Sequence, residues 1–169
     1  MVIENQINVL PWHKYRRWGY RPTHLINKIV LHQALCDATT KNINAYHIKP
    51  NHISSEGLPH FAYHYSIEKD GKVIQANELT HILAHTKSQN MSGIGIMLCG
   101  NFEGINWWSQ NAASPTPEQI TSLYFLLDKL IKDFNFNTGN LYTHAQFGKL
   151  ACPGLDIERA LNAYRKKLS

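Results

Sequence analysis

A histidine and a cysteine, His144 and Cys152, lie near the end of the chain with seven residues between them, and Pro153-Gly154 follows the cysteine. An imidazole and a thiolate so placed can bind one metal ion, and Pro-Gly favours a turn just past the thiol. His32, which ends the apolar run Ile29-Val-Leu, is a further histidine candidate. Two imidazoles and a thiolate are a common zinc ligand set that leaves a fourth position for water, as catalytic zinc sites do. The spacing alone is a weak indication, because such a pair arises by chance and a histidine in a buried strand is often an ordinary core residue.

The strands that must position these residues are indicated by runs of apolar side chains. Residues 28–33 predict a buried strand, because the run is short and β-branched at its start. Ile94–Leu98 predicts a second buried strand, and Leu141–His144 predicts a third that leads into the candidate ligand. Phe61–Gln75 predicts a hairpin, because apolar residues alternate along its first half and Asp70-Gly71 supplies the turn.

Helices are indicated between and after these strands. Thr116-Pro-Glu-Gln predicts a helix start, with threonine as N-cap, proline at the first helical position and glutamine three residues on. The helix is expected to end at Asn135–Gly139 and to turn an apolar stripe to the core, made of Ile120, Leu123, Leu127, Leu130, Ile131 and Phe134. Asp156–Leu168 predicts a terminal helix and Thr39–His47 a short one. Interleaved strands and helices indicate an α/β fold, with a central mixed sheet flanked by helices.

The composition indicates one globular domain. The chain has 169 residues, of which 43% are hydrophobic and 17% charged, so it can bury a core without disulfides. We therefore expect a single domain over residues 1–169, with residues 1–24 as an irregular aromatic arm packed on it. Trp107-Trp108, in the loop from Glu103 to Pro115, is expected near a cleft.

Charge and hydropathy limit the class of partner. The net charge of +5 suits anionic surfaces, among them a bacterial wall, although it also fits plain solubility. No basic cluster interleaved with aromatic residues is present, so we expect no nucleic-acid partner. No apolar run approaches 18 residues, so we expect no membrane insertion. The N-terminus lacks a basic stretch leading into an apolar core, so a Sec signal peptide is not expected.

The three cysteines do not suggest a disulfide framework. Cys36 and Cys99 have apolar neighbours in the sequence, and a free buried cysteine behaves as a small hydrophobe, so both are expected to be structural. Cys152 differs because Pro153 and Gly154 place it in a turn.

Six motifs resemble, in the same order along the chain, the zinc-dependent N-acetylmuramoyl-alanine amidases. This superfamily includes phage endolysins, bacterial autolysins and animal peptidoglycan-recognition proteins. The motifs are Arg17-Trp-Gly-Tyr-Arg-Pro22 with Ile29-Val-Leu-His32, then Tyr63–Val73, Ala84–Asn90, Gly93–Phe102, Pro115–Gln119 and His144–Gly154. The resemblance spans nearly the whole chain. It implies a peptidoglycan-recognition-protein-like amidase fold with zinc in a groove at one side of the sheet.

The resemblance also implies the ligand set. His32, His144 and Cys152 match three ligands of one Zn²⁺ per chain. Many relatives carry aspartate in place of the cysteine. Gln33 stands where many relatives have a second histidine, which is not required as a ligand.

Further roles follow from the resemblance. Tyr63 matches a tyrosine that hydrogen-bonds the attacking water or the carbonyl oxygen, although an ordinary packed aromatic would look the same. His85 and Asn90 match a loop beside the groove, which implies substrate contact. Relatives place lysine or threonine two residues before the cysteine as an oxyanion donor, where this chain has Leu150. We expect Lys149, one residue earlier, to take that catalytic role.

The implied function is hydrolysis of the amide bond between N-acetylmuramic acid and L-alanine in peptidoglycan or muropeptides. We expect a monomer that is made in the cytoplasm and acts on the cell wall after release, as an endolysin does, or on cytoplasmic muropeptides. The alternatives are a module that binds peptidoglycan without cutting it, and a structural zinc in a protein of other function. The second would need a fourth protein ligand, which no motif supplies.

Overall fold

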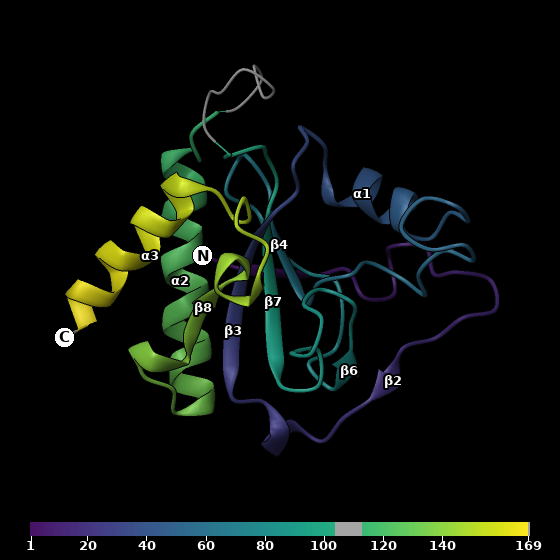
Figure 1. Cartoon of the computed structure of the whole chain (residues 1–169), viewed down its shortest axis with the longest axis horizontal. Helices are drawn as coiled ribbons and strands as arrows, with labels where there is room; N and C mark the ends of the chain where they lie inside the picture. Colours follow the sequence, from purple (N-terminus) through teal and green to yellow (C-terminus); the bar gives the residue numbers. More distant parts are fainter. Residues whose placement is uncertain (104–112, 169) are drawn as a thin grey trace.

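A mixed β-sheet forms the centre of the molecule in the computed structural model, which describes residues 1–103 and 113–168 (Figure 1). The six strands of this sheet lie in the order β1-β5-β4-β7-β3-β8. Their bounds are β1 Ile3–Asn5, β3 Lys28–Gln33, β4 Tyr65–Ile67, β5 Val73–Gln75, β7 Gly93–Leu98 and β8 Leu141–Thr143. The neighbours β4, β7, β3 and β8 run parallel, whereas β5 is antiparallel to β4. The predicted α/β class with a mixed sheet is confirmed.

Helices cover the sheet on both sides. The chain forms α1 over Thr40–His47, α2 over Pro117–Phe134 and α3 over Leu155–Leu168. In Figure 1 α2 and α3 lie together on one side of the strands, and α1 lies on the other. Three 3-10 turns complete the chain path, at Thr23–Leu25, Thr138–Asn140 and His144–Phe147.

Strand β3 separates the core from the candidate site. Successive side chains of a strand point to opposite faces. Ile29 and Leu31 belong to the cluster that packs against the leucines of α2, and both are fully buried. His32 therefore points to the opposite face, where it is also fully buried.

The start of α2 is capped as its sequence predicts. The Thr116 hydroxyl accepts a hydrogen bond from the Gln119 N–H (3.0 Å), and the Gln119 side chain accepts one from the Thr116 N–H (3.1 Å). The Gln119 amide group also donates to the carbonyl oxygens of Ile67 (3.2 Å) and Cys99 (2.9 Å). This cap therefore fastens α2 to the ends of two sheet strands.

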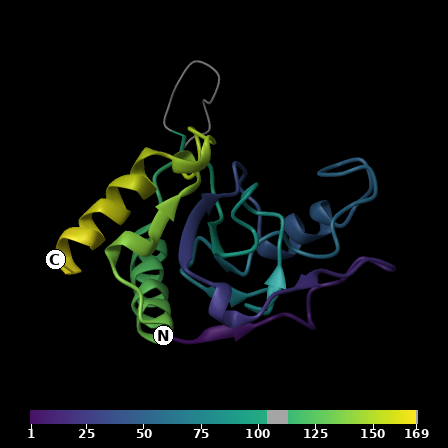
Figure 2. The same ribbon diagram turned by 60° about the horizontal axis from the view of Figure 1, so that its bottom comes forward.

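Two predicted segments differ from the structure. The arm over residues 1–24 is less irregular than expected, because β1 pairs in parallel with β5 and so forms an edge of the main sheet. Farther along it, β2 (Gly19–Tyr20) pairs with β6 (His81–Ile82) in a small second sheet, visible in Figure 2. The hairpin is shorter than Phe61–Gln75, because residues 61–64 lie outside the ladder of β4 and β5. None of the helices in residues 1–103 and 113–168 is long and apolar enough to cross a membrane.

Candidate metal centre

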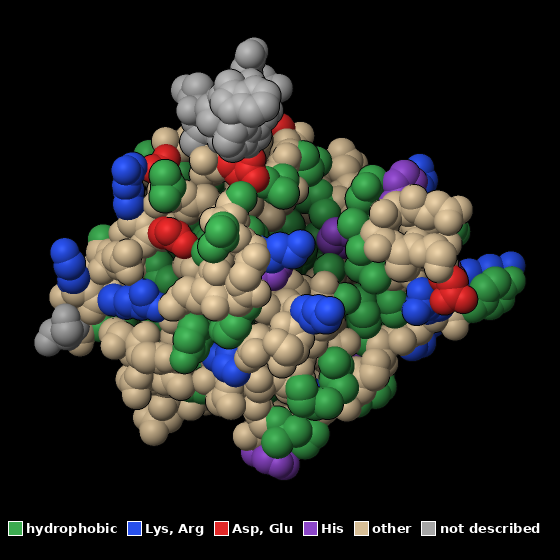
Figure 3. Space-filling model, viewed as in Figure 1, with side chains coloured by type: hydrophobic (Ala, Val, Ile, Leu, Met, Phe, Trp, Pro, Cys, Tyr) green, Lys and Arg blue, Asp and Glu red, His purple; other side chains and the backbone are tan. Residues whose placement is uncertain are grey.

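Three side chains converge at one edge of the sheet. His32, His144 and Cys152 each offer a ligand atom, and these atoms lie within 4.8 Å of one another. His32 Nδ1 is 3.0 Å from His144 Nδ1 and 3.8 Å from Cys152 Sγ. This is the one cluster of potential metal ligands that the described part of the chain contains. Figure 3 shows histidine side chains at the bottom of a hollow on this face, with Lys and Arg side chains beside it.

Neighbouring parallel strands bring the two histidines together. Strand β3 pairs with β8 in a register that sets Leu31 opposite Thr143. His32 and His144 are the next residues along these strands, so they leave the sheet side by side. At His144 the chain turns into a 3-10 helix, which ends the strand at the ligand.

The cysteine is positioned by a short turn and by Gln33. The Cys152 N–H donates to the Lys149 carbonyl oxygen (2.8 Å), which closes the turn. The buried Gln33 side chain donates to the Ala151 carbonyl oxygen (2.5 Å) and accepts from the Phe102 N–H (2.5 Å). Gln33 therefore ties the cysteine turn to β3 and to the segment that follows β7.

The chemistry of the three donors fits a divalent cation. Burial holds the pKa of His32 well below its ordinary value, and nearby His85 and His144 add to this effect. Burial and Lys149 also lower the pKa of His144, so both rings stay neutral and keep a lone pair for a metal. Burial raises the pKa of Cys152 to about 11, against a lowering by the Gln33 N–H and by Lys149. A coordinated thiol is deprotonated, so a metal ion would supply the positive charge that compensates the thiolate of this half-buried residue.

Tyr63 lies beside the three candidate ligands. Its ring centroid is 4.9 Å from that of His32, and the residue is partly buried. Burial is the main cause that raises the pKa of its phenol above the ordinary value. The hydroxyl therefore keeps its proton at neutral pH and can donate a hydrogen bond. The following residue, His64, is fully buried and interacts instead with Arg21.

The two residues predicted for substrate contact have different surroundings. His85 is 4% exposed, and its ring lies behind His32, with 3.2 Å between His85 Nδ1 and His32 Nε2. Asn90 is partly exposed, and its side-chain oxygen accepts from the Thr86 N–H (2.8 Å). The structure thus puts His85 in the second layer of the site, which the substrate-contact prediction did not anticipate.

The loop before the cysteine places a charge near the site. Lys149 is exposed, and its ammonium group is close enough to lower the pKa of both His144 and Cys152. Leu150 is 86% exposed and cannot donate a hydrogen bond. Of these two neighbours, Lys149 is the one able to act as a donor.

The other two cysteines lie apart from this group. Cys99 is buried, as expected, whereas Cys36 is exposed, so the expectation of two buried cysteines is wrong for Cys36. Trp107-Trp108 falls outside the described residues. The contacts through which Gln33 holds the cysteine turn were not predicted, because the family resemblance marks this residue only as standing where many relatives have a second histidine. Its place directly after a candidate ligand was the one available signal.

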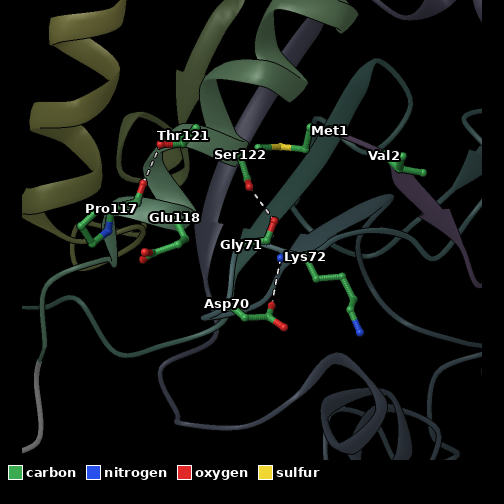
Figure 4. A pocket seen from close by; sticks show the side chains of 9 residues that line it. All are labelled: Met1, Val2, Asp70, Gly71, Lys72, Pro117, Glu118, Thr121 and Ser122. Carbon is green, nitrogen blue, oxygen red and sulfur yellow. Dashed lines mark hydrogen bonds between the residues drawn. The ribbon is translucent and has the colours of Figure 1, made fainter.

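A separate pocket of about 430 Å³ lies where the β4–β5 turn meets the start of α2 (Figure 4). Its polar groups bond within the chain, because Ser122 Oγ donates to the Gly71 carbonyl oxygen and Asp70 accepts from the Lys72 N–H. No candidate ligand lines this pocket, which we interpret as a joint between the hairpin and α2.

Comparisons with known proteins agree with this geometry. A sequence model of the N-acetylmuramoyl-L-alanine amidase family matches residues 21–155. Peptidoglycan-recognition protein SC2 of Drosophila simulans is 32% identical over 126 residues, which cover 74% of this chain and 61% of that protein. The endolysin of Enterobacteria phage T3 is 29% identical over 142 residues, which cover 83% of this chain and 88% of the endolysin.

The fold has the same relatives. The solved structure of the N-acetylmuramoyl-L-alanine amidase LysC from Clostridium intestinale URNW superimposes with a TM-score of 0.75. That likeness covers 96% of this chain and 97% of LysC at 24% sequence identity, so it speaks for the fold alone. The family match includes His32, His144 and Cys152, the residues that converge in the structure. The chain belongs to the N-acetylmuramoyl-L-alanine amidase family.

Proposed function

We propose that this protein is a zinc-dependent amidase that cleaves the bond between N-acetylmuramic acid and L-alanine in peptidoglycan. The observation that carries the proposal is the convergence of His32, His144 and Cys152 within 4.8 Å. This donor set of two imidazoles and one thiolate suits zinc, and it leaves room for a non-protein ligand. Family membership supports the choice of substrate.

The three proposed ligands share the work of holding one zinc ion. His32 and His144 contribute neutral imidazoles, and Cys152 contributes the single negative charge. A bound zinc ion supplies a net positive centre that acidifies water and polarises an amide carbonyl. Burial of His32 keeps bulk water from one side of the centre.

Tyr63 and Lys149 are the proposed catalytic residues. The Tyr63 phenol stays protonated and lies beside His32, so it can donate a hydrogen bond to the oxygen that gains charge in the tetrahedral intermediate. The Lys149 ammonium, in the loop before Cys152, can stabilise the same charge, because its field already lowers the pKa of Cys152 and of His144. Asn90, on the partly exposed loop, is proposed to contact substrate.

The oligomeric state and the place of action are part of the same proposal. We propose a monomer that is made in the cytoplasm and meets its substrate in the cell wall after release, as the similarity to an endolysin suggests. Action on muropeptides inside the cytoplasm is the second setting that the same site would serve.

One experiment tests the activity. Purified protein is incubated with peptidoglycan sacculi, with and without a zinc chelator, and free stem peptide with a new alanine amino terminus is measured. We expect release that stops with the chelator and returns when zinc is added. Binding to sacculi without release would instead favour a module that recognises peptidoglycan. The proposal would be refuted if the protein neither bound sacculi nor released stem peptide.

A further inference from the structure

The second ring nitrogen of His32 points away from the candidate metal centre into a buried layer. Its Nδ1 faces His144 and Cys152, whereas its Nε2 lies 3.2 Å from His85 Nδ1 and 3.3 Å from the Thr86 hydroxyl. His85 and Thr86 are 4% and 1% exposed. Solvent therefore has little access to the side of His32 that faces away from the metal centre.

The proton position on His85 is set by a backbone carbonyl. Its Nε2 lies 3.2 Å from the Gly93 carbonyl oxygen, which can only accept a hydrogen bond. His85 must therefore carry its proton on Nε2. In the neutral ring, Nδ1 is then an acceptor.

That arrangement determines the tautomer of His32. Its Nε2–H can donate directly to His85 Nδ1. Alternatively, His32 Nε2–H donates to the Thr86 hydroxyl, and that hydroxyl donates a hydrogen bond of 2.9 Å to His85 Nδ1. Both routes end on the same acceptor and place a proton on His32 Nε2. If the Thr86 hydroxyl donated to His32 Nε2 instead, the buried His85 Nδ1 would be left without a donor, which is unfavourable. His32 Nδ1 is then left with a lone pair that faces the metal centre.

Two glycines of β7 make space for this second layer. A Cβ on Gly95 would lie 2.7 Å from His85 Cγ, and a Cβ on Gly93 would lie 3.1 Å from His85 Cε1. Real Cβ atoms essentially never lie within 3.0 Å of a non-bonded heavy atom, so a side chain at position 95 would displace the ring. The glycines at positions 93 and 95 of β7 therefore do more than pair with neighbouring strands, because their lack of a side chain lets the His85 ring pack against the sheet.

We infer that His85 is a positioning residue, which, seated on Gly95 and oriented by the Gly93 carbonyl, fixes the ring and tautomer of His32 for metal binding. The inference rests on the proposed function, since it takes His32 as a ligand. It deepens that function by assigning His85 to the metal centre and away from the substrate. Residues that orient a ligand in this way typically contribute about 10–100-fold to metal affinity.

The test compares two variants at position 85 by zinc affinity, measured by chelator competition. His85→Leu removes the acceptor, and His85→Asn keeps one, because the asparagine Oδ1 can take the place of His Nδ1. We expect His85→Leu to weaken zinc binding about 10–100-fold and His85→Asn to retain most of the affinity. Gly95→Ala, which alters no polar group, should weaken binding in the same direction by displacing the ring. His60→Leu replaces another fully buried histidine, one bonded to Asn77, and serves as the matched control with affinity unchanged.

The outcomes separate this inference from the proposed function. Equal losses in His85→Leu and His85→Asn, or none in either, would overturn the positioning role while zinc binding by the parent protein stands. Failure of the parent to bind zinc would overturn the proposed function itself. Nitrogen-15 NMR of the metal-free parent protein reports which His32 ring nitrogen carries the proton, and this measurement requires no variant. A proton on His32 Nε2 is expected, and a proton on Nδ1 alone would overturn the inference.

Discussion

Gly154 and Phe102 meet backbone to backbone: a Cβ built on Gly154 would lie 2.0 Å from the Phe102 carbonyl oxygen. The turn after Cys152 is therefore packed closely against the segment that follows β7. Gln33 holds the same two segments through its side chain. The cysteine is thus fixed from both sides by groups that are not themselves ligands.

Gly154→Ala should therefore destabilise the fold. The residue has φ +96°, which alone costs an alanine about 1–3 kcal/mol, and the clash with Phe102 adds to that cost. Gly148→Ala is the matched control, because Gly148 has φ +91° but no atom lies within 4 Å of the place that an alanine Cβ would occupy. Urea unfolding should show a larger loss for Gly154→Ala. Equal losses would mean that the contact with Phe102 yields at no cost.

Cys152→Ala should abolish retention of stoichiometric zinc, since it removes the one anionic ligand of the proposed set. Cys36→Ala and Cys99→Ala should retain the metal, because neither belongs to the group. Metal analysis of each purified variant after dialysis gives the answer. Zinc loss in either control would point to a different thiol.

Tyr63→Phe should lower turnover and leave zinc content and stability unchanged, because only the phenol oxygen is removed. Losing one donor to the developing oxyanion costs roughly 10²–10³ in rate, or about 3–4 kcal/mol. Stem-peptide release under saturating substrate is the measurement. Turnover equal to that of the parent would assign Tyr63 to packing against His32.

Lys149→Ala should lower turnover by the loss of a charged hydrogen bond in the transition state, about 2–4 kcal/mol. The ammonium group already acts on His144 and Cys152, and its flexible stem can span the offset from position 150. Leu150→Lys is the companion variant, measured in the same assay. A neutral Lys149→Ala beside an improved Leu150→Lys would show that the donor is missing from this chain.

The free energy of unfolding should fall in mild acid partly through His47. This residue is 7% exposed, its Nδ1 accepts from the Ala62 N–H (3.1 Å), and burial lowers its pKa from 6.5 to about 4. Above pH 6.5 the ring is neutral in both states, so stability is complete. Between pH 6.5 and 4 only the unfolded chain binds the proton, and stability is lost; below pH 4 the loss is complete.

From about pH 7.5 to 5 this one residue should remove about 2 kcal/mol. His47→Asn keeps an acceptor for the Ala62 N–H and removes the titration. Its unfolding free energy should therefore fall less steeply than that of the parent over the same range. Parallel curves would show that His47 titrates normally in the folded protein.

Local sequence patterns were enough to predict the elements that carry the ligands. The run at residues 28–33 predicted β3 with its bounds, and Thr116 predicted the capped start of α2. In both cases the signal lies in neighbouring residues, through β-branching or a side chain that bonds three positions away. The metal group also came from the sequence, but only because the family resemblance joined His32 to His144.

The residues that lie behind the candidate ligands could not be predicted from local sequence patterns. Gln33 binds the carbonyl of Ala151, and His85 meets His32, so each contact joins segments that only the assembled sheet brings together. In the sequence His85 looks like a polar residue of an exposed loop. Its burial depends on the glycines of β7, which make space for the ring. The edge strand β1 escaped notice for a similar reason, since its three residues gain their structure from pairing with β5.

The order of the proposed ligands along the chain has a consequence for biosynthesis. His32 leaves the ribosome early, whereas His144 and Cys152 follow 112 and 120 residues later. At about 5–20 residues per second, the nascent chain carries His32 for on the order of ten seconds before its partners exist. Strand β8, which aligns the two histidines, is also made late. A metal ion can therefore meet all three proposed ligands only after Cys152 has been made, and a ribosome that stalls before Cys152 would yield a chain that lacks the thiol of this site.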